Sequence, residues 1–127
     1  MVLADGCFDP LHVGHIAYFR QAKEKSFAGC PLVVNIAPDA AILAKGRRPF
    51  QTQIERAELV LALGIVDRVT CYDLAEAILT LKPTYLAKGD DWVGRLPDAV
   101  RDACQRVGTE IIFTNTTFRP SSERLVS

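Results

Sequence analysis

The sequence predicts a three-layer α/β fold, a Rossmann-like sandwich with a five-stranded, mainly parallel sheet. Short apolar runs alternate along the chain with longer segments in which apolar residues recur at helical spacing. Parallel strands need crossover connections, and helices of this length supply them. The 127 residues are 49% hydrophobic and 24% charged, which is an ordinary globular composition. We therefore expect one domain, spanning residues 1–127.

The expected elements follow one another in strand-helix alternation. The apolar run at 2–4 is a strand that ends at Asp5 and Gly6, and it is followed by a helix at 15–25 and a strand at 32–37. Asp73 is placed to cap a later helix, and Ser121 or Ser122 a last short one. The remaining elements are helices at 53–63, 74–81 and about 97–107 and strands at 66–72, 84–87 and 110–114.

Charge and hydropathy exclude several classes of partner. Fifteen basic and fifteen acidic residues leave no net charge at pH 7. The broad positive potential that drives nonspecific binding to nucleic acids or anionic membranes is therefore missing. No apolar run approaches the ~20 residues that span a bilayer, and the first residues show no secretory signal. We expect a cytoplasmic protein that binds neither nucleic acid nor a membrane.

The loop at residues 5–15 is a phosphate-binding candidate. Ligands of open parallel sheets bind beyond the carboxyl ends of the strands, and this loop leaves the first strand there. Gly6 and Gly14 permit tight turns and a close approach of the backbone to a ligand. The amino terminus of the following helix favours an anion because its amides are unpaired and its dipole is positive.

His12 and His15 stand at the entrance of that helix, three residues apart. Each imidazole can donate a hydrogen bond to a phosphoryl oxygen, more strongly if it is protonated. Either one alone would be interpreted as a capping or surface residue. The pair could also bind zinc, but only Asp9 lies nearby as a third ligand. The absence of a P-loop and of G-x-G-x-x-G argues against a P-loop kinase or a dinucleotide dehydrogenase.

The segment Gly6-Cys7-Phe8-Asp9-Pro10-Leu11-His12-Val13-Gly14-His15 resembles the G-x-F-D-x-x-H-x-G-H signature of the cytidylyltransferase-like nucleotidyltransferases. The resemblance covers nearly the whole chain. It implies catalytic roles for His12 and His15. It also implies nucleotide contacts from the other motif residues, namely Gly6, Cys7, Phe8, Asp9 and Gly14.

A basic turn after the second strand contains Lys45, Arg47 and Arg48, which in isolation would be a solvated patch. Residues 45–49 with Glu55 and Arg56 look like the middle segment of the heptose 1-phosphate adenylyltransferases. This resemblance implies that Lys45 is catalytic and contacts the triphosphate. It assigns contacts with the acceptor phosphate to Arg48, Arg56 and Lys88.

Residues 88–92 form a third loop, after the fourth strand, and look more like the glycerol-3-phosphate cytidylyltransferases. Gly89 permits a close approach to the nucleotide. Asp90 and Asp91 are placed to accept hydrogen bonds from a base or ribose, although Asp91 could instead cap a helix. Trp92 packs either against the nucleotide or over the core.

Near the carboxyl end, Arg119, Ser121 and Ser122 resemble the start of the family's closing helix, which holds nucleotide phosphates. Two positions depart from the family pattern. Thr116 stands where the cytidylyltransferase branch has an arginine, and Glu123 stands where a hydroxyl is usual.

The resemblance implies transfer of a nucleoside monophosphate, CMP or AMP, from a nucleoside triphosphate to a sugar or polyol phosphate. The acceptor phosphate attacks the α-phosphorus directly and pyrophosphate leaves, with Mg²⁺ bridging the triphosphate. Residues 88–92 lean toward cytidine, and residues 45–49 lean toward adenosine. The resemblance also implies a homodimer. The alternative is a noncatalytic nucleotide-binding or sensing module of the same fold.

Overall fold

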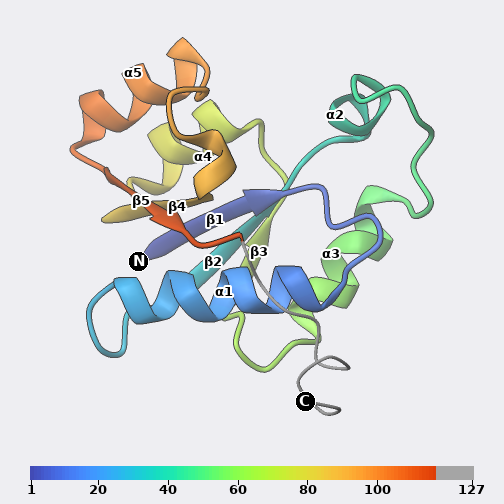
Figure 1. Cartoon of the computed structure of the whole chain (residues 1–127), viewed down its shortest axis with the longest axis horizontal. Helices are drawn as coiled ribbons and strands as arrows, with labels where there is room; N and C mark the ends of the chain where they lie inside the picture. Colours follow the sequence, from blue (N-terminus) through green and yellow to red (C-terminus); the bar gives the residue numbers. More distant parts are fainter. Residues whose placement is uncertain (117–127) are drawn as a thin grey trace.

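The computed structural model describes residues 1–116 and shows a five-stranded sheet in the order β3-β2-β1-β4-β5 (Figure 1). Every neighbouring pair of strands is parallel. The predicted Rossmann-like sandwich with a five-stranded, mainly parallel sheet is therefore confirmed. The strands are β1 Val2–Gly6, β2 Leu32–Ile36, β3 Arg68–Thr70, β4 Tyr85–Gly89 and β5 Glu110–Thr114.

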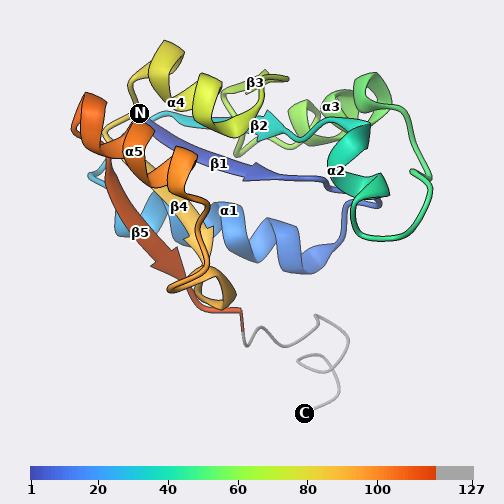
Figure 2. The ribbon, with the colours of Figure 1, turned by 90° about the horizontal axis from the view of Figure 1, so that it is seen from above.

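Helices cover both faces of the sheet because alternate strand residues point to opposite sides. Val2 and Ala4 pack with residues of α1 and α3 in one apolar core, whereas Leu3 packs under α4 and α5 in the other. Figure 2 shows α1 and α4 on opposite sides of β1. The helices are α1 Val13–Lys25, α2 Asp39–Leu43, α3 Gln53–Leu61, α4 Leu74–Leu81, the 3-10 turn η1 Asp90–Trp92, and α5 Asp98–Val107.

Local structure departs from the sequence prediction in short elements. α2 and η1 were not expected, because five and three residues are too few to show a helical period. β3 is shorter than the strand expected at 66–72. Asp73 occupies the cap position of α4, but its side chain makes no capping hydrogen bond. The helix expected after Ser121 or Ser122 lies outside the described residues.

Within residues 1–116, no helix is both long and apolar enough to cross a membrane.

Candidate active site

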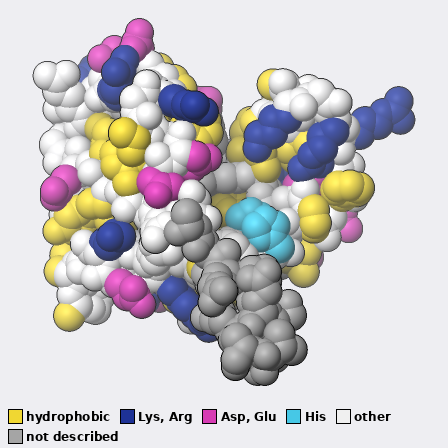
Figure 3. All heavy atoms as spheres, viewed as in Figure 1, with side chains coloured by type: hydrophobic (Ala, Val, Ile, Leu, Met, Phe, Trp, Pro, Cys, Tyr) yellow, Lys and Arg dark blue, Asp and Glu magenta, His cyan; other side chains and the backbone are white. Residues whose placement is uncertain are grey.

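A cleft of about 860 Å³ opens at the carboxyl ends of β1 and β4. Strand order reverses at this point, because the chain leaves β1 toward β2 and β3 and later returns to β1's other side as β4. Figure 3 shows this side of the molecule hollowed between the half that carries α4 and α5 and the half that carries α2, with the histidines at the edge. The predicted site residues that line the cleft are Gly6, Cys7, Phe8, Asp9, His12, Gly14, His15, Lys45, Lys88, Gly89 and Asp91.

Three other predicted site residues do not line the cleft. Arg48 is exposed, and neither Arg48 nor Asp90 belongs to the cleft lining. Thr116, which stands where the cytidylyltransferase branch has an arginine, lines the cleft. Arg56 is fully buried away from the lining. The predicted phosphate-binding residues Arg119, Ser121 and Ser122, with Glu123, lie outside the described residues.

Both histidines cap α1 with the same ring nitrogen. The backbone N–H of Gly14 donates to Nδ1 of His12 at 3.0 Å, and the N–H of His12 donates to Nδ1 of His15 at 3.1 Å. The two rings stack with their centroids 3.7 Å apart. A neutral imidazole that accepts at Nδ1 carries its proton on Nε2. We therefore assign the Nε2–H form to both rings, which leaves Nε2 as the donor.

Burial, together with the charges of the nearby His12 and Lys45, lowers the pKa of His15 to about 4. The ring of Phe8 packs edge-on against it, with the centroids 5.0 Å apart. His15 is therefore neutral near pH 7 in the unliganded protein. It offers a phosphoryl oxygen an uncharged N–H, not the protonated donor that the sequence also allowed.

Aromatic rings explain the two glycines of the motif. A Cβ on Gly14 would lie 2.8 Å from Cε1 of His12, and a Cβ on Gly6 would lie 2.9 Å from the ring of Phe8. Real Cβ atoms essentially never make contacts this short. Any larger residue at position 14 would therefore displace the ring that caps the helix.

Asp9 ties loop 5–15 to the segment that carries Lys45. Its carboxylate accepts hydrogen bonds from the backbone of Phe50 and Gln51, both at 2.9 Å, and from Arg47 at 2.7 Å. Burial by itself would raise the pKa of Asp9, but these hydrogen bonds outweigh it and hold the pKa below its ordinary value. The carboxylate thus positions residues 47–51, which follow Lys45.

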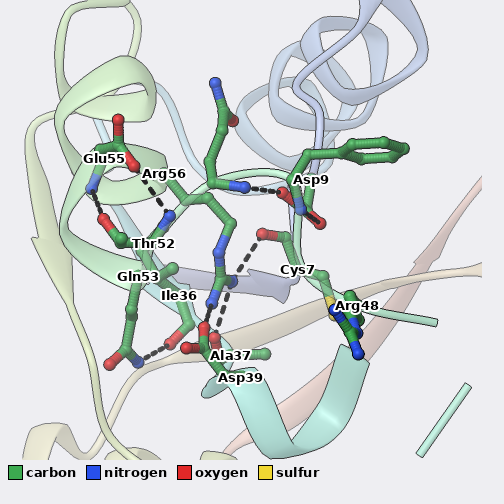
Figure 4. Close-up of polar contacts among 12 residues, drawn as sticks. Cys7, Asp9, Ile36, Ala37, Asp39, Arg48, Thr52, Gln53, Glu55 and Arg56 are labelled. Atoms are coloured by element: carbon green, nitrogen blue, oxygen red, sulfur yellow. Dashed lines mark hydrogen bonds and ion pairs between the residues drawn. The ribbon is translucent and has the colours of Figure 1, made fainter. Parts of the chain in front are cut away.

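The guanidinium of Arg56 connects three segments beneath the cleft (Figure 4). It donates to the carbonyl oxygens of Cys7 at 2.9 Å and Ala37 at 2.8 Å, and to Asp39 at 2.6 Å. The residue has no exposed surface. The sequence predicted that Arg56 contacts an acceptor phosphate. In the structure, its guanidinium lies on the inner side of α3 and holds the loops after β1 and β2 instead.

Lys88 lies on the floor of the cleft and is 5% exposed. Its Nζ is 3.5 Å from Oδ2 of Asp5 and 4.4 Å from the centre of the Trp92 ring. Trp92 is 38% exposed, so it covers this ammonium and not the core. A carboxylate and an aromatic face together keep a positive charge in a mostly buried position.

Asp90 and Asp91, the first two residues of η1, have side chains in different surroundings. Oδ1 of Asp90 accepts hydrogen bonds from the Oγ1 of Thr116 at 2.5 Å and from its backbone N–H at 3.3 Å. Asp91 lines the cleft instead. A Cβ on Gly89 would lie 2.5 Å from Oδ1 of Asp91, which explains the glycine. Thr116, which replaces the arginine of the cytidylyltransferase branch, therefore links the segment after β5 to η1.

Sequence reasoning missed the polar network under the floor. Asn35 is fully buried in β2, and its amide donates to Oδ1 of Asp5 at 3.0 Å and to the carbonyl oxygen of Tyr72. Its oxygen accepts from the Thr70 hydroxyl and the Tyr72 N–H. The hydroxyl of Tyr18 accepts from the Asp5 N–H and donates to a β4 carbonyl. The sequence feature that could have indicated this network is Asn35, a polar residue within the apolar run at 32–37.

Within the described part of the chain, no group of three or more His, Cys, Asp or Glu side chains is placed to hold a metal ion. His12 and His15 each use Nδ1 for a backbone hydrogen bond, and the carboxylate of Asp9 is occupied by residues 47–51. The Nδ1 atoms of both histidines and the carboxylate of Asp9 therefore already have hydrogen-bond partners within the protein.

Comparison with known proteins gives relatives of two kinds. The chain is 41% identical to the bifunctional protein HldE of Campylobacter fetus over 100 residues, which are 75% of this chain and 21% of that protein. It is 43% identical to the FAD synthase of Thermococcus sibiricus over 96 residues, 71% of this chain and 62% of that protein. The chain therefore spans only part of the curated relatives it matches.

Solved structures share the fold over most of the chain. A lipopolysaccharide core biosynthesis protein from Thermoplasma volcanium has a TM-score of 0.72 and 27% identity, covering 90% of this chain and 93% of that one. A protein from Archaeoglobus fulgidus has a TM-score of 0.69 and 18% identity, covering 91% of this chain and 90% of that one, and supports the fold alone.

The cytidylyltransferase-like family model matches residues 3–124, almost the whole chain. The match includes the histidine pair and all three loops around the cleft. The chain belongs to the cytidylyltransferase-like family of nucleotidyltransferases.

Proposed function

We propose that this chain is an adenylyltransferase that moves AMP from ATP to a phosphorylated small molecule and releases pyrophosphate. The observation that carries the proposal is the set of donors at one cleft: Nε2–H of His12 and His15, the amino end of α1, and Lys45. These groups suit the phosphates of a nucleotide.

The relatives support adenosine over cytidine. One is named for the synthesis of FAD, which contains an adenylyl group. The HldE proteins agree with the resemblance of residues 45–49 to heptose 1-phosphate adenylyltransferases. The cytidylyltransferase-like features of residues 88–92 make CTP the second nucleotide to test.

The proposed reaction is a direct displacement. An oxygen of the acceptor phosphate forms a bond to the α-phosphorus of ATP, the bond from that phosphorus to the bridging oxygen breaks, and pyrophosphate leaves. No proton has to be removed from the acceptor because its phosphate is already an anion. The histidines and Lys45 would align the two phosphates and stabilise charge that develops on the α-phosphate and the leaving group.

We propose that Mg²⁺ enters with ATP, since phosphate oxygens are the hard ligands this ion prefers. It would neutralise charge on the triphosphate. The chain's own contribution would come from Lys45, whose segment is held in place by Asp9 and Arg47.

The test is a screen of four nucleoside triphosphates with Mg²⁺ against phosphorylated sugars, polyols and aromatic phosphate esters, read as pyrophosphate release. We expect release with ATP and one class of acceptor. Release with CTP alone would overturn the choice of base. Nucleotide binding without release from any pair would favour the noncatalytic module that the sequence also allowed.

Two variants test the histidine. His15→Ala removes a preorganised donor, which typically lowers kcat by about 10²–10³-fold. His15→Gln can keep an N–H donor near the position of Nε2, so it should retain more activity. A well-folded His15→Ala variant with less than about tenfold lower activity would contradict the assignment.

A further inference from the structure

A row of polar side chains crosses four strands of the sheet and reaches the floor of the cleft. Strand register pairs Asp5 of β1 with Asn35 of β2, and Asn35 with Thr70 of β3. On the other side of Asp5, the Nζ of Lys88 on β4 is 3.5 Å from its Oδ2. Asp5 and Lys88 line the cleft, whereas Asn35 and Thr70 are buried in the sheet. The row therefore connects the site with the interior of the sheet.

The backbone of Tyr72 fixes the orientation of the Asn35 amide. The N–H of Tyr72 donates to Oδ1 of Asn35 at 2.9 Å, and the carbonyl oxygen of Tyr72 accepts from its Nδ2 at 2.8 Å. A flipped amide would place N–H against N–H and oxygen against oxygen. In the orientation that satisfies both groups, Nδ2 also donates to Oδ1 of Asp5 at 3.0 Å. Asn35 thus holds one oxygen of the Asp5 carboxylate and leaves the other, Oδ2, toward Lys88.

The strands β1 and β4 separate at the floor of the cleft. Their pairing ends at Ala4 and Ala87, whereas β1 continues beside β2 beyond this point. The hydrogen bonds of a parallel pair recur at every second residue, and the N–H of Tyr85 donates to the carbonyl oxygen of Met1. By the same spacing, the N–H of Asp5 faces the carbonyl oxygen of Ala87 where the pairing ends.

Tyr18 places its hydroxyl between these two backbone groups. The hydroxyl accepts a hydrogen bond from the N–H of Asp5 at 3.1 Å and donates one to the carbonyl oxygen of Ala87. Burial raises the pKa of Tyr18 well above its ordinary value, so the hydroxyl keeps the proton for the second bond. The inserted hydroxyl lengthens the span between the two backbone groups. It thereby holds β1 and β4 apart where Asp5 and Lys88 enter the cleft.

These contacts restrict where the ammonium of Lys88 can lie. It has the Asp5 carboxylate on one side and the ring of Trp92, with its centre 4.4 Å from Nζ, on another. A lysine side chain is a flexible four-carbon stem, and its ammonium has three N–H donors. Donors therefore remain for a phosphate oxygen beside Asp5. A donor that is already in place stabilises developing charge better than a mobile one, because it needs no reorganisation during the reaction.

We propose that Tyr18 and Asn35 are positioning residues that act through Asp5 on Lys88, so that its ammonium meets a phosphate oxygen of a substrate. Tyr18 holds the backbone of Asp5, and Asn35 holds its carboxylate. The proposal rests on the proposed nucleotidyl transfer and adds two residues to its machinery. The bonds that form and break are those of the direct displacement, and neither Tyr18 nor Asn35 gives or takes a proton in it.

A double-mutant cycle with ATP, Mg²⁺ and the acceptor found in the screen tests whether Tyr18 acts through Lys88. Tyr18→Phe removes only the hydroxyl and should lower kcat/KM at least about tenfold, since a misplacement of about 1 Å can cost as much as a hundredfold. Lys88→Met removes the ammonium. In that background Tyr18→Phe should change kcat/KM less than about twofold, because no ammonium is left to position. No loss in the native background, or equal losses in both, would overturn the proposal.

Asn35→Asp tests the other support of Asp5. The variant keeps the oxygen to which Tyr72 and Thr70 donate, and it replaces the N–H that Asp5 accepts by a second acceptor. It should lower kcat/KM at least about tenfold, and only when Lys88 is present. A loss of the same size in the Lys88→Met background would contradict the role of Asn35. If Asn35→Asp does not fold, the cycle with Tyr18→Phe decides the proposal.

Thr109→Val is the matched control for loss of a buried hydroxyl. The hydroxyl of Thr109 donates to the carbonyl oxygen of Pro83 at 2.6 Å, at the amino ends of β4 and β5 and so at the opposite end of the sheet from the cleft. Thr109→Val should lower the free energy of unfolding, as Tyr18→Phe does, and leave kcat/KM within about twofold. Equal losses of kcat/KM in the two variants would show a general effect of lost stability and overturn the proposal.

NMR of the unliganded chain separates this proposal from the proposed function. Lysine ammonium groups give proton–nitrogen correlation signals when burial and hydrogen bonding slow their exchange with water. We expect such a signal for Lys88 in the native chain and in Thr109→Val, and its loss in Tyr18→Phe. A signal that is absent from the native chain, or unchanged in Tyr18→Phe, would overturn the positioning role. If no pair of substrates released pyrophosphate, the proposed function would fail, and the NMR signal alone would decide this inference.

Discussion

Replacing Asp9 by alanine tests whether a buried carboxylate holds the segment that carries Lys45. The Asp9 side chain has no exposed surface and accepts hydrogen bonds from the N–H groups of Phe50 and Gln51 and from Arg47. Hydrogen bonds to a charged group contribute about 1.5–3 kcal/mol each. Arg47 is 38% exposed, so water can replace its partner. The two backbone bonds at the low end of the range give about 3 kcal/mol.

Urea unfolding followed by circular dichroism measures this loss, and the melting temperature should fall by about 10 °C. Asp98→Ala is the control because Asp98 pairs with Arg101 on the surface, where ion pairs contribute no more than about 1 kcal/mol. Equal losses in the two variants would refute the reasoning.

The pH dependence of Asp9→Asn gives a second check. Because the folded state lowers the pKa of Asp9, its stabilisation is present above the unfolded pKa of about 3.9 and is lost as the pH falls through the lower folded value. The difference in free energy of unfolding between the native chain and Asp9→Asn should therefore shrink below about pH 4. A difference that stays constant down to acid unfolding would contradict a buried, charged Asp9.

Three further outcomes are expected. NMR titration of the unliganded protein should give His15 a midpoint near pH 4. Because only the unfolded chain takes up that proton between about pH 6.5 and 4, the free energy of unfolding should fall as the pH is lowered through this range. A midpoint near 6.5 would contradict the burial of His15. Gly14→Ala should displace the His12 ring and lower kcat by up to roughly a hundredfold, whereas Gly64→Ala, with open space at its Cβ, should leave kcat unchanged; equal kcat values would count against the steric argument. Arg56→Met should lower the free energy of unfolding by about 3 kcal/mol, the low end for two charged hydrogen bonds, in urea titrations. If Arg56→Met were as stable as the native chain and only the KM for the acceptor rose, the result would support the contact between Arg56 and the acceptor phosphate that the sequence predicted.

Much of the fold could be predicted because its signals are local. The apolar runs that became β1 and β2 and the helical spacing in α1 and α4 reflect neighbours within one turn or one strand. The motif at residues 6–15 likewise joins the first strand to the first helix, and in the structure its histidines lie at the start of α1. Short elements such as α2 left no such pattern, since their conformation depends on contacts made elsewhere in the chain.

The roles of individual charged residues depend on partners distant in sequence. In the sequence, Arg48 and Arg56 are both arginines of the same basic region, and nothing local distinguishes them. In the structure, Arg56 is buried and donates to carbonyl oxygens 19 and 49 residues away, whereas Arg48 is exposed. Asp9 meets its donors across 38 to 42 residues, and Asp5 meets Asn35 across 30. Hydrogen-bond partners at such separations cannot be assigned from periodicity or motif spacing.

By itself, therefore, the sequence determined the layer architecture, the family and the loop that we propose for phosphate binding, because propensity, periodicity and a ten-residue motif act over short distances. Tertiary structure alone decided which nitrogen of each histidine is free, which basic side chains reach the cleft, and that Tyr18 and Asn35 hold Asp5 beside Lys88. Those properties arise where the carboxyl ends of β1 and β4 bring separate segments together, and burial there sets both protonation and access.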